Sequence, residues 1–177
     1  MNRNSDQILT EWLVLNAQSG KAAAMDQLLR TWYPKFLRYS AHQLRDSEAA
    51  KDVVQETLVT VAKKITSLKD PVAFPKWAYQ ILHHRGVDYQ RSEIRRRNRE
   101  ATEIVETQPE FDSETGEIVR DALTALDGLS YNVIHLHYLH DLSLRDIAAI
   151  CCIPVGTVKS RLHTARGKLK NLLAEKL

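Results

Sequence analysis

Apolar residues recur every three or four positions along most of the chain, which is the spacing of an amphipathic helix. The third segment of this kind is the most regular, because Val53, Val54 and Val61 share one face while the opposite face is polar. Pro34 is expected to kink or interrupt the second segment. The pattern predicts an all-α chain whose first half holds four helices, at about 6–18, 22–44, 47–67 and 74–97.

A second group of helices, at about 118–173, contains a helix-turn-helix pattern. Ser143 is suited to cap a helix whose third residue is Asp146, and Pro154 suits the start of the helix that follows the break. Proteins with this pattern lay the second helix in the major groove, where its N-terminal side chains read base edges. The pattern predicts DNA binding, although an ordinary helical hairpin with a basic surface has the same spacing.

Charge is distributed unevenly along the 177 residues, although the net charge is only +3. Residues 76–99 carry seven Lys or Arg and two acids, whereas residues 100–117 carry seven acids and no Lys or Arg. The acidic stretch is weakly apolar and contains Pro109 and Gly116, which is typical of a linker. We therefore expect two small helical domains joined by a flexible acidic linker, divided as 1–97, 98–117 and 118–177.

Several functional classes lack their signals in this sequence. No apolar run approaches the roughly 20 residues that cross a bilayer, and the polar start does not resemble a signal peptide. A cytoplasmic protein without membrane insertion is therefore expected. The adjacent Cys151 and Cys152 cannot form a disulfide framework. Gly-rich phosphate loops, metal-spaced carboxylates and nucleophile motifs are not found, so we expect neither an enzyme with catalytic residues nor a cofactor or metal site.

Two sets of residues resemble those of the extracytoplasmic-function (ECF) family of bacterial RNA polymerase sigma factors. The run Pro-Val-Gly-Thr-Val-Lys-Ser-Arg at 154–161, with the residues at 142–148 before it, resembles region 4 of that family. The run Asp-Val-Val-Gln-Glu-Thr at 52–57, followed by Phe-Pro-Lys-Trp at 74–77, resembles region 2. The resemblance covers about residues 8–173 and leaves only the acidic linker unmatched.

The resemblance implies a sigma factor that binds core RNA polymerase and directs initiation at specific promoters, with an anti-sigma factor as its regulating partner. The residues implied in polymerase docking lie on the polar face of the third helix: Asp52, Gln55 and Glu56. The following loop and helix imply contacts to the minus-ten promoter DNA by Ser67, Leu68, Lys69, Asp70, Lys76, Trp77, His84, Arg85, Asp88 and Arg91. The minus-thirty-five element would be read by Lys159, Ser160, Arg161, His163, Thr164 and Arg166.

The chain departs from the family pattern at three of its positions. His84 stands where the family usually has Asn, and Thr164 stands where a basic residue is frequent. Cys152 occupies a turn position that usually holds Gly, Asn or Asp, and a left-handed backbone there would cost about 1 kcal/mol relative to Gly.

Alternatives to these assignments stay open from sequence alone. A stand-alone helix-turn-helix regulator would explain the second domain but not the run at 52–57. Trp77 could simply belong to the core rather than contact DNA. The two cysteines, together with the histidines at 135, 137 and 140, could sense metal or oxidants. However, His135 and His137 are two residues apart, so their side chains lie on different faces of a helix.

Overall fold

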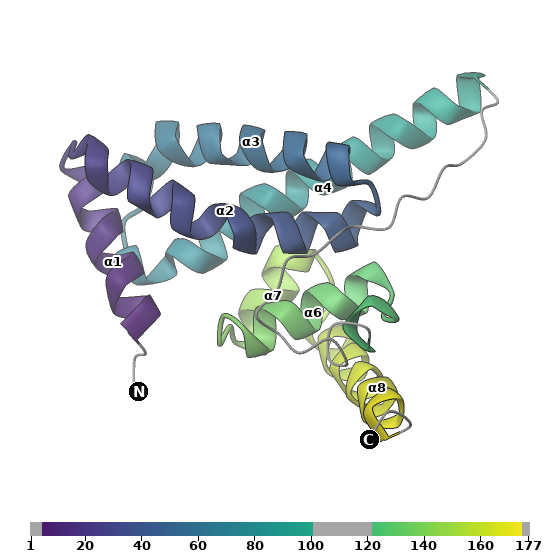
Figure 1. Cartoon of the computed structure of the whole chain (residues 1–177). Coiled ribbons are helices and arrows are strands. Elements are labelled where there is room, and N and C mark those ends of the chain that lie inside the picture. Colours follow the sequence, from purple (N-terminus) through teal and green to yellow (C-terminus); the bar gives the residue numbers. More distant parts are fainter. Residues whose placement is uncertain (1–4, 101–121, 175–177) are drawn as a thin grey trace.

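The computed structural model describes residues 5–100 and 122–174, and these residues contain helices but no strand. The first half forms a helical bundle, and the described residues of the second half form a smaller helical group that packs against it (Figure 1). The bundle consists of α1 (Ser5–Gln18), α2 (Ala22–Leu44), α3 (Ser47–Lys64), the short 3-10 helices η1 (Ile65–Ser67) and η2 (Pro71–Ala73), and α4 (Phe74–Glu100). The second group consists of α6 (Gly128–Tyr138), α7 (Leu144–Cys151) and α8 (Val155–Ala174).

The helix boundaries follow from local sequence signals. Asp46 caps α3, since its carboxylate accepts hydrogen bonds from the backbone N–H groups of Glu48 and Ala49, both at 3.0 Å. Arg45, which ends α2, has a left-handed backbone with φ of 52°. The interruption expected at Pro34 is absent, because α2 is a continuous helix through this residue. Packing of its buried face, with Trp32 and Phe36 on either side of the proline, holds the helix together.

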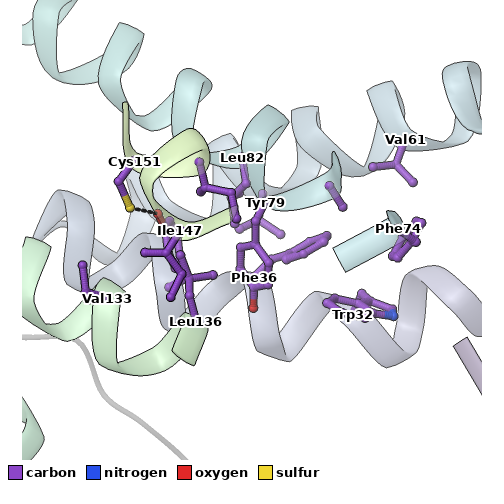
Figure 2. Packing of buried hydrophobic residues seen from close by; sticks show 14 of the residues in the cluster. Trp32, Phe36, Val61, Phe74, Tyr79, Leu82, Val133, Leu136, Ile147 and Cys151 are labelled. Carbon is purple, nitrogen blue, oxygen red and sulfur yellow. Dashed lines mark hydrogen bonds between the residues drawn. The ribbon is translucent and has the colours of Figure 1, made fainter. Parts of the chain in front are cut away.

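Aromatic side chains fill the centre of the first bundle (Figure 2). The ring of Trp32 lies 5.5 Å from that of Phe36 and 5.2 Å from that of Phe74, and Phe36 lies 5.2 Å from Tyr79. The last of these pairs is edge-to-face, an arrangement that adds to the gain from burial alone. Val61 brings α3 into the same core, so α2, α3 and α4 share one packed centre.

The second group has the expected helix-turn-helix form. Ser143 caps α7, and its hydroxyl oxygen accepts a hydrogen bond of 3.1 Å from the backbone N–H of Asp146. Cys152 ends the helix with φ of 53°, so this turn position is left-handed and the cost considered for a residue other than Gly applies. The inner face of α8 is formed by buried apolar residues: Val158, Leu162 and Ala165.

The two groups pack on each other rather than standing apart. Helix α6 lies against α2, and α7 lies against α4, so one apolar cluster runs through both groups (Figures 1 and 2). Most of the segment expected to be an acidic linker lies outside the described residues, and α4 continues to Glu100. The domain boundaries at 97 and 118 therefore stay predictions. None of the helices described is long and apolar enough to cross a membrane.

Candidate polymerase and nucleic-acid interfaces

The polar face of α3 presents the three residues expected to dock on polymerase. Asp52, Gln55 and Glu56 are all exposed, while Val53 and Val54 between them are buried against the core. The helix therefore separates a packing face from a free polar face, as its amphipathic pattern requires. Asp52 and Gln55 are therefore available to a partner, and Glu56 is exposed as well although it has a contact within the bundle.

Glu56 also connects α3 to α4. Its Oε2 atom lies 2.5 Å from Arg85 Nη1, and Arg85 Nη2 donates a 2.6 Å hydrogen bond to Thr60 Oγ1. An expected polymerase contact is thereby joined to an expected DNA contact. Thr60 did not stand out in the sequence, although its position four residues after Glu56 on the same face would have indicated it.

The expected DNA contacts in the loop between α3 and α4 differ in exposure, since one is buried and the others are exposed. Leu68 is buried at 9% exposure, and Gln18 Nε2 holds the loop by donating to the carbonyls of Ile65 (2.9 Å) and Leu68 (2.7 Å). Asp70 is an exposed cap of η2, accepting 3.0 Å from the N–H of Val72. Leu68 and Gln18 therefore fix the loop, which leaves its exposed polar members outward: Ser67, Lys69 and Asp70.

The side chains of α4 that are expected to contact DNA lie in different surroundings. Trp77 is partly buried and lies 6.0 Å from the ring of Phe74, so it takes part in the core without being enclosed by it. Lys76 Nζ lies 2.7 Å from Asp146 of α7. Asp88 and Arg91 are exposed, with a long 4.0 Å pair between them.

His84 is the expected DNA contact nearest to the cysteines. It is exposed, and its Nε2 atom lies 3.4 Å from the sulfur of Cys152. Cys151 is buried beside Tyr39, and burial raises the pKa of its thiol to about 11, so this thiol is protonated and unreactive at neutral pH. Within the described residues, no three potential ligands gather into a group that could hold a metal ion.

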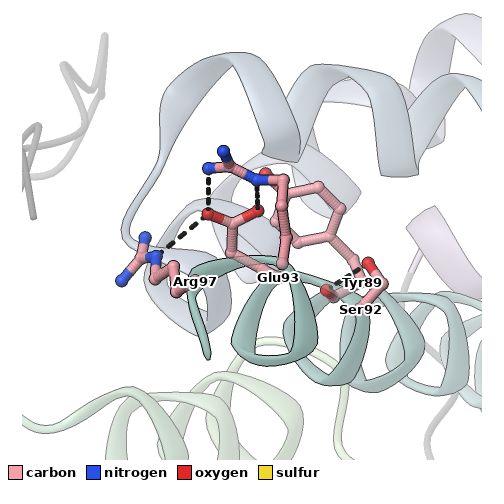
Figure 3. Close-up of polar contacts among 5 residues, drawn as sticks. Tyr89, Ser92, Glu93 and Arg97 are labelled. Carbon is pink, nitrogen blue, oxygen red and sulfur yellow. Dashed lines mark hydrogen bonds and ion pairs between the residues drawn. The ribbon is translucent and has the colours of Figure 1, made fainter. Parts of the chain in front are cut away.

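The C-terminal end of α4 is rich in arginine, but part of its charge is compensated within the helix (Figure 3). Glu93 accepts hydrogen bonds from Arg96 (2.6 Å) and Arg97 (2.9 Å). These bonds lower the pKa of the Glu93 carboxyl to about 2. Arg95 is exposed on the same helix, so a basic surface continues past the expected minus-ten contacts.

Helix α8 presents an exposed polar face with the residues expected to read the minus-thirty-five element: Lys159, Ser160, His163 and Thr164. Two other members of the expected set are engaged within this group of helices. Arg161 donates to Asp127 at 3.3 Å, and Arg166 donates to the hydroxyl of Tyr138 at 2.5 Å. The structure therefore brings four of the six side chains together as a free surface and gives the other two a structural contact.

Models of known protein families match both helical groups. The family model described as "Sigma-70 region 2" matches residues 28–99, and "Sigma-70, region 4" matches residues 117–169. The first match covers α3 and α4, whose faces were described above, and the second covers the helix-turn-helix. A stand-alone regulator does not account for the first match.

Whole relatives and solved structures agree with these matches. RNA polymerase sigma factor YlaC of Bacillus subtilis is 31% identical over 157 residues, which cover 83% of this chain and 90% of the relative. ECF RNA polymerase sigma factor EcfG of Rhodopseudomonas palustris is 33% identical over 72% of this chain and 73% of its own. The sigma factor RpoE of Bartonella quintana, solved with the anti-sigma factor NepR, has a TM-score of 0.70 at 25% identity and covers 84% of this chain and 96% of its own. The chain belongs to the ECF family of RNA polymerase sigma factors and is an alternative sigma factor that directs transcription initiation.

Proposed function

We propose that the chain docks on core polymerase through Asp52, Gln55 and Glu56 of α3. The observation that supports this assignment is the exposure of all three side chains on one polar face, opposite the buried stripe. Carboxylates on this face would pair with basic side chains of the polymerase. The phosphodiester chemistry belongs to the polymerase, and the chain supplies promoter selection in the cytoplasm.

We assign the minus-ten element to the loop before α4 and to the exposed side of that helix. The exposed Ser67 and Lys69 stand beside the buried Leu68, an arrangement suited to holding a flipped base against a fixed loop. Trp77 is only partly buried, which suits stacking on a base, and Arg91 is exposed with only a long 4.0 Å pair to Asp88, so it can hold a phosphate. The minus-thirty-five element is assigned to the exposed face of α8.

Run-off transcription with purified core polymerase and a promoter library tests the function. Discrete start sites that share two spaced upstream elements are expected. Changing the α3 face in the D52N/E56Q variant should weaken binding to core polymerase at least tenfold, because two charges are removed from the docking surface. Asp26→Asn is the matched control, since Asp26 is an exposed acid on α2 outside the proposed surface. Equal polymerase affinity of the double variant and the control would contradict the assignment.

We also propose that an anti-sigma protein inhibits this chain. The sigma factor RpoE of Bartonella quintana was solved with the anti-sigma factor NepR, and CnrH, with a TM-score of 0.59, was solved with the cytosolic domain of CnrY. A protein that copurifies with the chain from its native host should abolish run-off transcription when it is added back in stoichiometric amounts. Undiminished transcription in its presence would count against an inhibitory partner.

A further inference from the structure

The basic side chains of α8 lie on two different faces of the helix. One face, the outer stripe, is exposed and holds four side chains that follow each other at helical spacing: Lys159, His163, Arg166 and Lys170. Arg161 and Lys168 lie on the other face, and Arg161 contacts the carboxylate of Asp127 at 3.3 Å. Burial raises the pKa of Asp127, but its hydrogen bonds and the charges of Arg161 and Lys168 lower the pKa overall. The charge of this second face is therefore partly compensated within the chain.

Arg166, on the outer stripe, is held by a side chain of another helix. Its Nε atom donates a 2.5 Å hydrogen bond to the hydroxyl oxygen of Tyr138, and its guanidinium carbon lies 5.4 Å from the centre of the Tyr138 ring. Tyr138 lies at the end of α6, 28 residues earlier in the chain, and is 52% exposed. An arginine loses much rotamer freedom when it binds a ligand. Because Tyr138 already restricts Arg166, part of this cost is met before a ligand arrives.

Tyr138 holds Arg166 without cancelling its charge. A carboxylate at position 138 would also fix the arginine, but it would repel an anion. Among the described residues, Arg166 contacts no carboxylate, and its two terminal NH2 groups have no partner. The Tyr138 oxygen accepts the bond from Nε and still has its own proton to donate. The two residues therefore offer several donors next to each other with a full positive charge, which suits a phosphate group.

We propose that Tyr138 and Arg166 form a phosphate-binding pair that contacts the DNA backbone at one edge of the minus-thirty-five element. The inference rests on the proposed role of α8 in reading that element. Arg166 lies seven residues after Lys159, or about 10 Å along the helix. The N-terminal residues of a recognition helix reach the base edges, so a residue two turns later lies nearer to the backbone. Tyr138 is thereby added to the DNA-contacting residues, and Arg166 is a backbone contact rather than a base reader.

The outer stripe is open to DNA in the full chain. Helix α8 packs on α6 and α7 and extends away from the first helical bundle (Figure 1). The pair can therefore be tested while the two helical groups stay packed on each other, which is the closed arrangement of the chain.

The experiment measures the affinity of the full chain for two short duplexes by fluorescence anisotropy over a series of salt concentrations. One duplex carries the minus-thirty-five element found by run-off transcription, and the other carries the same bases in scrambled order. Arg166→Gln removes the charge, whereas Tyr138→Phe removes the hydroxyl and keeps the ring. Lys168→Gln is the matched control, because it removes the same charge from the opposite face of α8. Lys159→Gln tests the proposed reading face itself.

We expect Arg166→Gln to weaken binding to both duplexes about tenfold. It should also reduce the slope of log affinity against log salt by about 0.9, the value for one phosphate contact, while Lys168→Gln leaves this slope unchanged. Tyr138→Phe should weaken binding about three- to fivefold without changing the slope, because it removes a hydrogen bond and no charge. The double variant should lose less than the product of the two single effects, since both residues act on one phosphate.

An equal effect of Tyr138→Phe with and without the Arg166→Gln change would overturn the pair, because Tyr138 would then act independently of the arginine. A salt slope of Arg166→Gln equal to that of Lys168→Gln, or a loss of affinity for the element alone, would overturn the phosphate contact. If Lys159→Gln leaves the preference for the element over the scrambled duplex unchanged, the proposed reading by α8 fails. The salt slope of Arg166→Gln still decides in that case whether the pair binds phosphate.

Discussion

Acid should open the two helical groups, because histidines at their interface are held uncharged. His42 stacks on Tyr131 of α6 with 3.3 Å between ring centroids, and His83 lies 2.9 Å from the hydroxyl of Tyr39. Burial lowers the pKa of each to about 4, with smaller cationic contributions from Arg45 on His42 and from His84 on His83. Burial also lowers the pKa of His140 to about 3, aided by Lys35.

The direction of the pH dependence follows from the lowered pKa. A histidine that is harder to protonate in the closed chain contributes its full stabilisation above its ordinary pKa of 6.5 and loses it as the pH falls from 6.5 toward about 4. At pH 5 the loss is about 2 kcal/mol for each fully buried histidine, from 1.36 kcal/mol per pKa unit. His42 and His83 together amount to about 4 kcal/mol of total stability, and the part that falls on docking is smaller, because His83 is also buried against Tyr39 of its own helical group.

Small-angle scattering and circular dichroism of the full chain between pH 7.5 and pH 4 test this prediction. We expect the radius of gyration to rise from about 16 Å before helical ellipticity falls, with the midpoint below pH 6.5. His42→Phe keeps a ring against Tyr131 but cannot be protonated, so it should lower the midpoint. His163→Phe, at an exposed position on α8, should leave it unchanged. A constant radius to pH 4, or expansion only when the helices melt, would refute the reasoning.

Three further substitutions test local parts of the structure. Phe36→Ala removes a fully buried ring and should cost about 3–5 kcal/mol in the free energy of unfolding measured with urea; a loss below 1 kcal/mol would contradict this packing. Ser143→Ala should cost about 1 kcal/mol, because it removes the cap of α7, and equal stability would show that the cap is not formed. Cys152→Gly should stabilise the turn by about 0.5–1 kcal/mol relative to Cys152→Ala, since only glycine relieves the left-handed backbone; an advantage for alanine would show that this strain is absent.

Local features were predictable from sequence because their causes lie within a few residues. The stripe of α3 and the cap at Ser143 each depend on neighbours along the chain, and the structure confirms both. Pro34 is the exception: the sequence predicts a kink or an interruption, and the interruption is absent, because burial of the residues around it keeps α2 continuous. Tertiary packing overrides local preference there.

The site was only partly predictable, because its connections join distant residues. Asp52, Gln55 and Glu56 were expected on one exposed face, and the structure places them there. The hydrogen bonds of Gln18 to the loop span 47 and 50 residues, and no periodicity marks them. The same holds for Tyr79 and His135, which are 56 residues apart.

The closed arrangement also explains why the turn of the helix-turn-helix tolerates an unfavourable residue. Cys152 adopts φ of 53°, where glycine is preferred by on the order of 1 kcal/mol. Within region 4 the exposed side chain has only long contacts, 3.9 Å from its sulfur to the carbonyl oxygens of Ala149 and Ile150. In the closed chain the same side chain contacts His84 of α4, so part of the cost is recovered only when the two regions are docked. Replacing Cys152 by Gly should therefore stabilise region 4 and weaken docking at the same time. A substitution that acts in opposite directions on the two equilibria separates an interface residue from one that serves the turn alone.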